Sequence, residues 1–199
     1  MNISGRMTRL MSILVALSGL YGVTPLVHAE DNGWYVGAGV TGLQTTLDYG
    51  YTETYTTTHA RLSVGYQFLR FLSVEGRLLS PSKDTDVDFL GDTYSFRTGT
   101  AFGIYARPHT NFNSANVYGI IGLTAVDTRY RNVTLSGPED SDTIFLETVG
   151  VGGSFTLARN FYLEIEAQVF AGVAKYNTYF ADYVDVYGAA IGAGLRYRF

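Results

Sequence analysis

The carboxy-terminal residues of the chain alternate strictly between two kinds of side chain. One set is apolar and ends on the terminal aromatic residue: Ala189, Ile191, Ala193, Leu195, Tyr197 and Phe199. The other set is small or charged: Ala190, Gly192, Gly194, Arg196 and Arg198. A period of two residues is that of a β-strand, whose successive side chains point to opposite faces of a sheet. The pattern predicts a strand, but alternation alone does not say which face turns inward.

Similar alternation recurs along the chain and predicts an all-β fold. No segment after residue 29 keeps an apolar helical period over three turns. We expect eight antiparallel strands, near 33–44, 56–68, 72–79, 94–107, 115–126, 143–156, 160–170 and 185–199. Long and short connections alternate between them, which is typical of an up-and-down transmembrane β-barrel with short periplasmic turns and longer outer loops. A soluble periplasmic barrel is the less favoured reading of the same strands.

The amino-terminal segment has the features of an export signal. Arg6 and Arg9 precede an apolar run over residues 10–23, and Ala29 is a small residue at a suitable cleavage position. We therefore expect residues 1–29 to be a cleaved signal peptide and residues 30–199 to form the barrel domain. A membrane-anchoring helix is the alternative, but the run is shorter than the roughly 20 residues that a spanning helix needs.

Composition excludes several classes of function. The chain has no cysteine, which rules out disulfides, a lipoprotein anchor and cysteine-ligated metal. Removal of residues 1–29 takes away two of the 14 basic residues and none of the 18 acidic ones, which leaves a net charge of −6. This balance argues against nucleic acid or another polyanion as the main partner.

Aromatic residues gather near the ends of the expected strands. One group falls at the expected periplasmic ends: Trp34, Tyr66, Phe68, Phe71, Phe161, Tyr197 and Phe199. A second group falls at the opposite ends: Tyr94, Phe96, Phe145, Phe170 and Tyr187. Two such girdles are expected where a barrel crosses the two membrane interfaces. The register of the strand near 143–156 stays open, because Glu147 and Val149 share one face.

Several local sequences resemble the small eight-stranded outer-membrane β-barrel family, which includes the transmembrane domain of OmpA. The stretches are Gly-Trp-Tyr-Val-Gly-Ala-Gly-Val at 33–40, Gly-Tyr-Gln-Phe at 65–68 followed by Leu-Ser-Val-Glu-Gly at 72–76, Val-Tyr-Gly at 117–119, and the Gly-Leu-Arg-Tyr-Arg-Phe ending. The resemblance implies an outer-membrane location, surrounded by lipid and lipopolysaccharide. It also implies that the assembly machinery recognises the last strand through Leu195, Tyr197 and Phe199. Unlike full-length OmpA, the chain is expected to have no peptidoglycan-binding domain after the barrel.

An eight-stranded barrel is so narrow that side chains fill its interior. The polar faces of the expected strands carry charges of both signs: Arg61, Arg77, Arg97, Arg196 and Arg198 with Glu75, Glu164 and Glu166. Buried charges persist only when they are paired. We predict an interior ion-pair network that plugs the lumen. A gated path for protons or ions through the same groups is the alternative.

The sequence indicates no catalytic, cofactor or metal site. His59 stands among threonines and is interpreted as a rim residue, while His109 falls in an expected turn. Asp84, Asp86 and Asp88 resemble the start of a calcium loop, but Phe89 replaces its required glycine, and Ser95 its bidentate glutamate. A strand extension explains these aspartates better. Enzymes do occur in the resembling family, and the enzymatic reading is the minority one.

The remaining candidates for function are the exposed loops. Tyrosines cluster at residues 49–51 and 175–180, and acidic residues at 84–88 and 127–142. Loops on a rigid scaffold often carry binding residues, and tyrosine is a good contact residue. We therefore expect a structural or surface-binding barrel that contacts a host or surface ligand through these loops. A narrow channel for ions or small solutes is the alternative function.

Overall fold

The computed structural model describes residues 33–48, 52–81, 85–89, 92–112, 115–132, 140–174 and 184–199. Within these residues the chain forms β1 (Gly33–Asp48), β2 (Thr52–Leu69), β3 (Leu72–Leu79), β4 (Thr85–Phe89), β5 (Asp92–Phe112), β6 (Ala115–Asn132), β7 (Asp140–Ala158), β8 (Phe161–Ala174) and β9 (Val184–Arg198). Among them no helix is long and apolar enough to cross a membrane.

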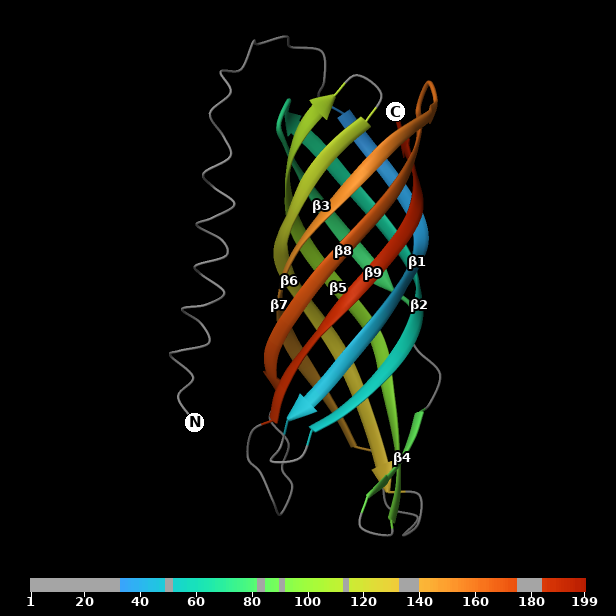
Figure 1. Ribbon diagram of the computed structural model, residues 1–199, viewed down its shortest axis with the longest axis vertical. Helices are drawn as coiled ribbons and strands as arrows, with labels where there is room; N and C mark the ends of the chain where they lie inside the picture. Colours follow the sequence, from blue (N-terminus) through green and yellow to red (C-terminus); the bar gives the residue numbers. More distant parts are fainter. Residues whose placement is uncertain are drawn as a thin grey trace.

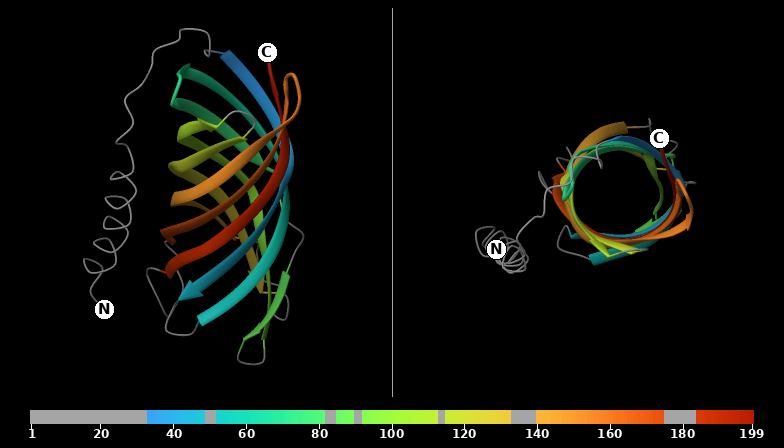
Figure 2. Two further views of the ribbon diagram at one scale, coloured as in Figure 1. Left: turned by 45° about the horizontal axis from the view of Figure 1, so that its top comes forward. Right: turned by 90° about the horizontal axis from the view of Figure 1, so that it is seen from above.

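The strands form one sheet that closes on itself. Neighbours follow the order β3-β2-β1-β9-β8-β7-β6-β5-β4, and a further pairing of β3 with β5 completes the ring. All pairings are antiparallel. Seen along the barrel axis, the strands surround a single lumen (Figure 2). β4 pairs only with β5 and lies beyond β3, so the barrel itself has eight strands, which confirms the predicted fold class.

The strands are tilted because their pairing is staggered. Following the paired residues once around the ring from Val36 returns to β1 at Thr46 rather than at Val36. In a closed barrel, such a stagger requires strands inclined by about 40° to the axis. Figure 1 shows the strands running obliquely to the long axis of the barrel.

The two ends of the barrel differ. Gly33 and Phe199 lie at one end, together with the two-residue turns at 70–71 and 159–160. This is called the terminal end below. The opposite end, called the loop end, carries β4 and the strand ends at Asp48, Asn132 and Ala174 (Figure 1).

The outward face of the barrel is an apolar band. Its large exposed side chains include Val40, Leu62, Leu78, Ile104, Leu123, Val151, Ile165 and Ile191. Aromatic residues ring the terminal end: the rings of Trp34 and Tyr66 are 5.1 Å apart, and those of Tyr197 and Phe161 4.9 Å. An apolar exterior bounded by aromatic residues is the surface of a barrel that contacts lipid.

Several strands continue toward the loop end beyond the predicted limits. β2 begins at Thr52 and β6 ends at Asn132, whereas alternation of apolar residues predicted 56–68 and 115–126. β5 spans Asp92–Phe112 and exceeds its predicted limits, 94–107, mainly at the terminal end. The added part of β2 is rich in threonine, which favours strands even where no apolar face is needed. β4 extends the sheet within the aspartate-rich connection, where a strand extension was expected. Asp84 and the side chains of Asp86 and Asp88 lie outside the described part of the structure.

The aromatic prediction is wrong at one position. Phe170 turns inward and is only 7% exposed, whereas Phe145 and Tyr187 face outward near the loop end as expected. The side chains of Tyr94 and Phe96 lie outside the described residues. The structure also settles the open register of β7, because Leu146 is buried and Glu147 is exposed on the lipid-facing side.

Candidate functional site: the filled lumen

The lumen holds a continuous chain of ion pairs in which arginine and glutamate alternate. Its members, in order, are Arg61, Glu166, Arg77, Glu75, Arg107, Glu164 and Arg196. They belong to β2, β3, β5, β8 and β9, so the ion-pair chain crosses the barrel interior. Each glutamate contacts two arginines. The side chains are nearly inaccessible except that of Arg196, which is 15% exposed toward the terminal end.

Arg77 occupies the middle of this ion-pair chain. Its Nη1 and Nη2 donate to the two carboxylate oxygens of Glu166 at 2.8 and 3.0 Å, a bidentate geometry. Its Nε donates to Glu75 at 2.6 Å. Arg107 also bonds to Glu75 and reaches Glu164 with its Nη2 at 2.7 Å. The charges thereby meet the condition for burial, which is pairing with good hydrogen-bond geometry.

Tyrosine rings fill the space around the guanidinium groups. Arg107 Cζ lies 3.9 Å from the ring centroid of Tyr118, and Arg77 Cζ lies 4.6 Å from that of Tyr105. At these distances the ring faces attract the cations. Tyr118 has room because Gly152 lies beneath it: a Cβ on Gly152 would come within 2.6 Å of the tyrosine hydroxyl. Glycines in the lumen therefore make space for the rings that pack against the ion-pair chain.

The structure brings together most of the residues predicted for an interior network. Six of them belong to the ion-pair chain: Arg61, Glu75, Arg77, Glu164, Glu166 and Arg196. Arg198 lies on the same face of β9, partly exposed at the terminal end and paired in register with Tyr35. The predicted network did not include Arg107. This residue lies two positions after the inward-facing Tyr105, and that spacing would have placed it on the same inward face.

Arg97 is placed differently from the prediction. β5 contains a bulge, because Thr98 pairs with Thr128 whereas Ala101 pairs with Val126. The extra residue reverses the alternation, so Thr98 lines the lumen and Arg97 lies opposite the exposed Arg129 on the outer face. Gly99 marks the bulge: a Cβ there would lie 2.9 Å from the carbonyl oxygen of Asp127. The prediction assumed unbroken alternation and was wrong for Arg97.

A second group of inward side chains is entirely apolar. It comprises Leu79, Ala101, Val126, Ile144, Leu146, Phe170, Val186 and Ala190, with Leu43 and Leu47 packed against it. This apolar layer lies nearer the loop end than the ion-pair chain does, since Leu79 follows Arg77 along β3 and Phe170 follows Glu166 along β8. The lumen is therefore filled by charge in one half, and in the other by hydrocarbon together with uncharged polar groups such as Thr45, Thr57 and Thr128.

His59 lies inside the barrel, so its interpretation as a rim residue is wrong. It is 2% exposed; its Nδ1 donates to the carbonyl oxygen of Ser80 at 2.6 Å, and its Nε2 lies 2.9 Å from the Thr57 hydroxyl. His109 is part of β5 rather than of a turn, and its backbone N–H donates to Phe71 at 2.8 Å. Within the described ranges no group of three acidic, histidine or cysteine residues is placed to hold a metal ion.

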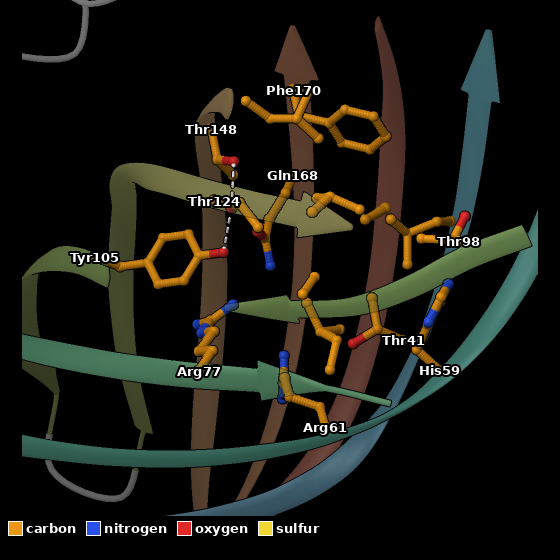
Figure 3. Close-up of a pocket in the computed structure, with 16 residues that line it drawn as sticks. Thr41, His59, Arg61, Arg77, Thr98, Tyr105, Thr124, Thr148, Gln168 and Phe170 are labelled. Carbon is orange, nitrogen blue, oxygen red and sulfur yellow. Dashed lines mark hydrogen bonds between the residues drawn. The ribbon is translucent and has the colours of Figure 1, made fainter. Parts of the chain in front are cut away.

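A small cavity separates the two halves of the lumen (Figure 3). Its volume is about 50 Å³. Arg61, Arg77 and Gln168 border it on the side of the ion-pair chain, and the apolar layer borders it on the other, with Phe170 among its members. The other polar residues of its wall are Thr41, His59, Thr98, Tyr105, Thr124 and Thr148. The ion-pair chain and the apolar layer therefore both border this cavity.

Comparison with known proteins identifies the family. Residues 13–199 match the family model described as the outer membrane protein beta-barrel domain. The chain belongs to this family. Its members are outer-membrane proteins, so the apolar band is the surface that contacts outer-membrane lipid and lipopolysaccharide. No curated protein matches the sequence.

Solved structures share the fold at low sequence identity. Neisserial surface protein A (NspA) is 18% identical, with a TM-score of 0.64 over 84% of this chain and 97% of that one. Ail, the attachment invasion locus protein of Yersinia pestis, solved with the heparin analogue sucrose octasulfate, is 18% identical, with a TM-score of 0.51 over 83% and 99%. A major outer membrane protein from Thermus thermophilus is 13% identical, with a TM-score of 0.51 over 83% and 99%. These likenesses support the barrel architecture alone.

Proposed function

We propose that this protein is a closed, non-conducting and non-enzymatic outer-membrane barrel whose loop end faces outside the cell and binds a surface partner there. The observation that carries the proposal is the double filling of the lumen, by the ion-pair chain and by the apolar layer. A barrel closed in this way is a scaffold and anchor. Its binding residues then belong to the outer connections rather than to the interior.

The apolar layer supports closure more strongly than the ion-pair chain does. Charged side chains could in principle rearrange and pass an ion between them, which is the alternative of a narrow channel. An ion that reached the apolar layer would lose hydration and meet hydrocarbon with a few threonine hydroxyls but no opposite charge, and hydrophobic constrictions exclude ions for this reason. Ile144, Leu146 and Val126 are each less than 9% exposed in this layer.

Strand length supports a role for the loop end in binding. About 10 residues suffice for a tilted strand to cross the membrane, yet β5 has 21 residues, β6 has 18 and β7 has 19. At the loop end, where β5 and β7 begin and β6 ends, these three neighbouring strands extend beyond the apolar band and form a rigid support for the connections at that end. The tyrosine clusters at 49–51 and 175–180 lie outside the described residues and remain candidates for contact.

The charge of the chain bears on the kind of partner. Ail was crystallised with a highly sulfated heparin analogue. The net charge of −6 expected after removal of residues 1–29 opposes a polyanion of that kind here. We propose instead a host or surface ligand that is neutral or basic where it meets the loop end.

Delivery to the membrane is part of the proposal. Residues 1–29 would direct export and be removed, leaving 30–199 as the barrel domain. The last strand presents Leu195 and Phe199 outward, 51% and 72% exposed, with Tyr197 between them, its ring 5.2 Å from that of Phe199. These three residues would be read by the assembly machinery before the strand pairs with β1.

Planar-bilayer recordings of the refolded protein test closure. We expect no steady conductance steps, and stable steps at neutral pH would instead establish the channel.

Binding is tested by replacing residues 133–139 with a short glycine-serine turn and measuring attachment to host cells or matrix. Heat-modifiable gel mobility serves as the control for folding. Loss of attachment with unchanged mobility is the expected result, and unchanged attachment for this and the other loop replacements would overturn the binding role.

A further inference from the structure

The ion-pair chain carries an excess of positive charge. Among the described residues it contains four arginines and three glutamates and ends on an arginine at each side. Arg196 ends it near solvent at the terminal end, whereas Arg61 ends it deep in the lumen, 4% exposed. The carboxylate that Arg61 contacts belongs to Glu166, which also accepts both Nη atoms of Arg77 and the amide of Gln168. Each terminal arginine thus contacts one carboxylate that it shares with a second arginine, and of these two ends of the ion-pair chain Arg61 is the more deeply buried.

The cavity between the two halves of the lumen lies at this end of the ion-pair chain. Thr41 also lines it and is 4% exposed, and its hydroxyl has no hydrogen-bond partner among the described residues. Arg61 and Thr41 converge on one point. A Cβ added to Gly192 would lie 3.0 Å from Arg61 Nη1 and 3.2 Å from Thr41 Oγ1. A guanidinium group and a hydroxyl without a partner therefore lie close together at the wall of the cavity, beside the Glu166 side chain, whose Cγ would lie 3.3 Å from the same Cβ.

The other polar groups of the cavity already have partners. The Tyr105 hydroxyl bonds to Thr124 at 2.7 Å, and Thr124 contacts Thr148 at 3.3 Å (Figure 3). Both ring nitrogens of His59 are occupied by Thr57 and Ser80. Two requirements remain at the cavity: the Thr41 hydroxyl needs a hydrogen-bond acceptor, and the positive charge of Arg61 favours a negative charge nearby. Water would satisfy the first requirement and not the second.

We propose that the cavity binds a small monovalent anion of the size of chloride, held by Arg61 and the Thr41 hydroxyl. Its single charge balances the ion-pair chain, and its lack of donors suits a wall made of donors on one side and hydrocarbon on the other. The volume of about 50 Å³ exceeds the roughly 10–15 Å³ needed by one water and leaves room for one such ion. The site is independent of the binding proposed for the loop end, because it lies entirely within the lumen.

Bromide, which scatters anomalously, is the probe for this site. The protein is refolded from urea into detergent in sodium bromide, so that the barrel closes around the ion, and is then crystallised. We expect an anomalous peak within hydrogen-bond distance of both Arg61 and Thr41. Water density in the cavity with no anomalous signal would overturn the proposal, and so would bromide found only on the outer surface.

A solution measurement separates the site from general salt effects. The temperature of unfolding is compared in chloride, in bromide and in gluconate, which is too large to enter, at equal ionic strength. We expect chloride and bromide to raise the temperature of unfolding by about 3 °C when the anion concentration is roughly ten times its Kd. Thr41→Val should abolish this difference, whereas Thr45→Val, on the same face of β1 but outside the cavity lining, should keep it. An equal response of the two variants would contradict the assignment, whether or not the loops bind a partner.

Discussion

The two halves of the lumen are enclosed by the same eight strands but are filled in different ways. In the terminal half each interior glutamate contacts two arginines, so the satisfaction of one charge depends on several others. In the half near the loop end each side chain of the apolar layer contributes its own buried surface. We therefore expect the contributions of the charged residues to the free energy of unfolding to depend strongly on one another. The contributions of the apolar residues should be largely independent.

Loss of a shared carboxylate should have the largest effect. Glu75→Gln leaves Arg77 and Arg107 in place without the charge that they share, and uncompensated buried charge is strongly destabilising. We expect the free energy of unfolding to fall by about 4 kcal/mol. Urea unfolding of the refolded protein, followed by fluorescence of the single tryptophan, Trp34, measures it. Glu147→Gln is the matched control on the outer face, and equal effects of the two substitutions would remove the contrast.

Truncation in the apolar layer should cost somewhat less. Leu146→Ala removes buried hydrocarbon and leaves a void next to the existing cavity, and we expect a loss of about 3 kcal/mol. The same urea titration measures the loss, with heat-modifiable mobility to verify the fold. No loss at all would mean that the layer contributes little packing in the folded barrel.

Double substitutions sharpen the comparison further. Glu75→Gln and Arg107→Gln affect partners in one ion pair, so the double variant should be more stable than the sum of the single effects predicts, by about 2 kcal/mol. Glu75→Gln combined with Leu146→Ala places one substitution in each half of the lumen. Their effects on the free energy of unfolding should add to within about 0.5 kcal/mol. Additivity in the first pair, or strong coupling in the second, would show that the two halves do not differ as described.

The smallest effect is expected on the lipid-facing side. Glu147 lies within the apolar band, two residues from Phe145 along β7, and pairs in register with Leu123 and Ala171. A carboxylate facing lipid near the interface is mildly unfavourable. Glu147→Leu should therefore raise the free energy of unfolding in phospholipid bilayers by up to about 1 kcal/mol. A decrease would indicate that Glu147 has a favourable partner in the membrane.

Alternation in the sequence was sufficient to predict the eight barrel strands and the inward position of most lumen charges. It worked where pairing is regular, as on β2, β3, β8 and β9, because a period of two residues fixes the face of every side chain. It failed at Arg97, because one extra residue at a bulge reverses the faces without changing the composition. A glycine between Thr98 and Thr100 was the only local sign of that bulge.

The apolar layer could not be predicted from the sequence pattern. In a barrel with lipid outside, apolar residues are expected outside, so Phe170 was assigned to an aromatic girdle although it alternates with the outward-facing Val169. On β7, apolar residues occupy both faces near Leu146, so alternation has no contrast there. The sequence also could not predict which arginine pairs with which glutamate, because the partners lie on strands far apart in sequence and meet only when the barrel closes.

The order in which the members of the ion-pair chain occur along the polypeptide has a consequence for assembly. Strands β1 to β5 supply Arg61, Arg77 and Arg107 but only Glu75, so the first half of the barrel brings a surplus of cations to its own interior. The missing carboxylates, Glu164 and Glu166, arrive together on β8. Electrostatic repulsion among the early strands is thus relieved late, when β8 joins the sheet and just before β9 pairs with β1 to complete the ring. An intermediate that lacks β8 would hold Arg61, Arg77 and Arg107 with Glu75 as the only carboxylate of the ion-pair chain.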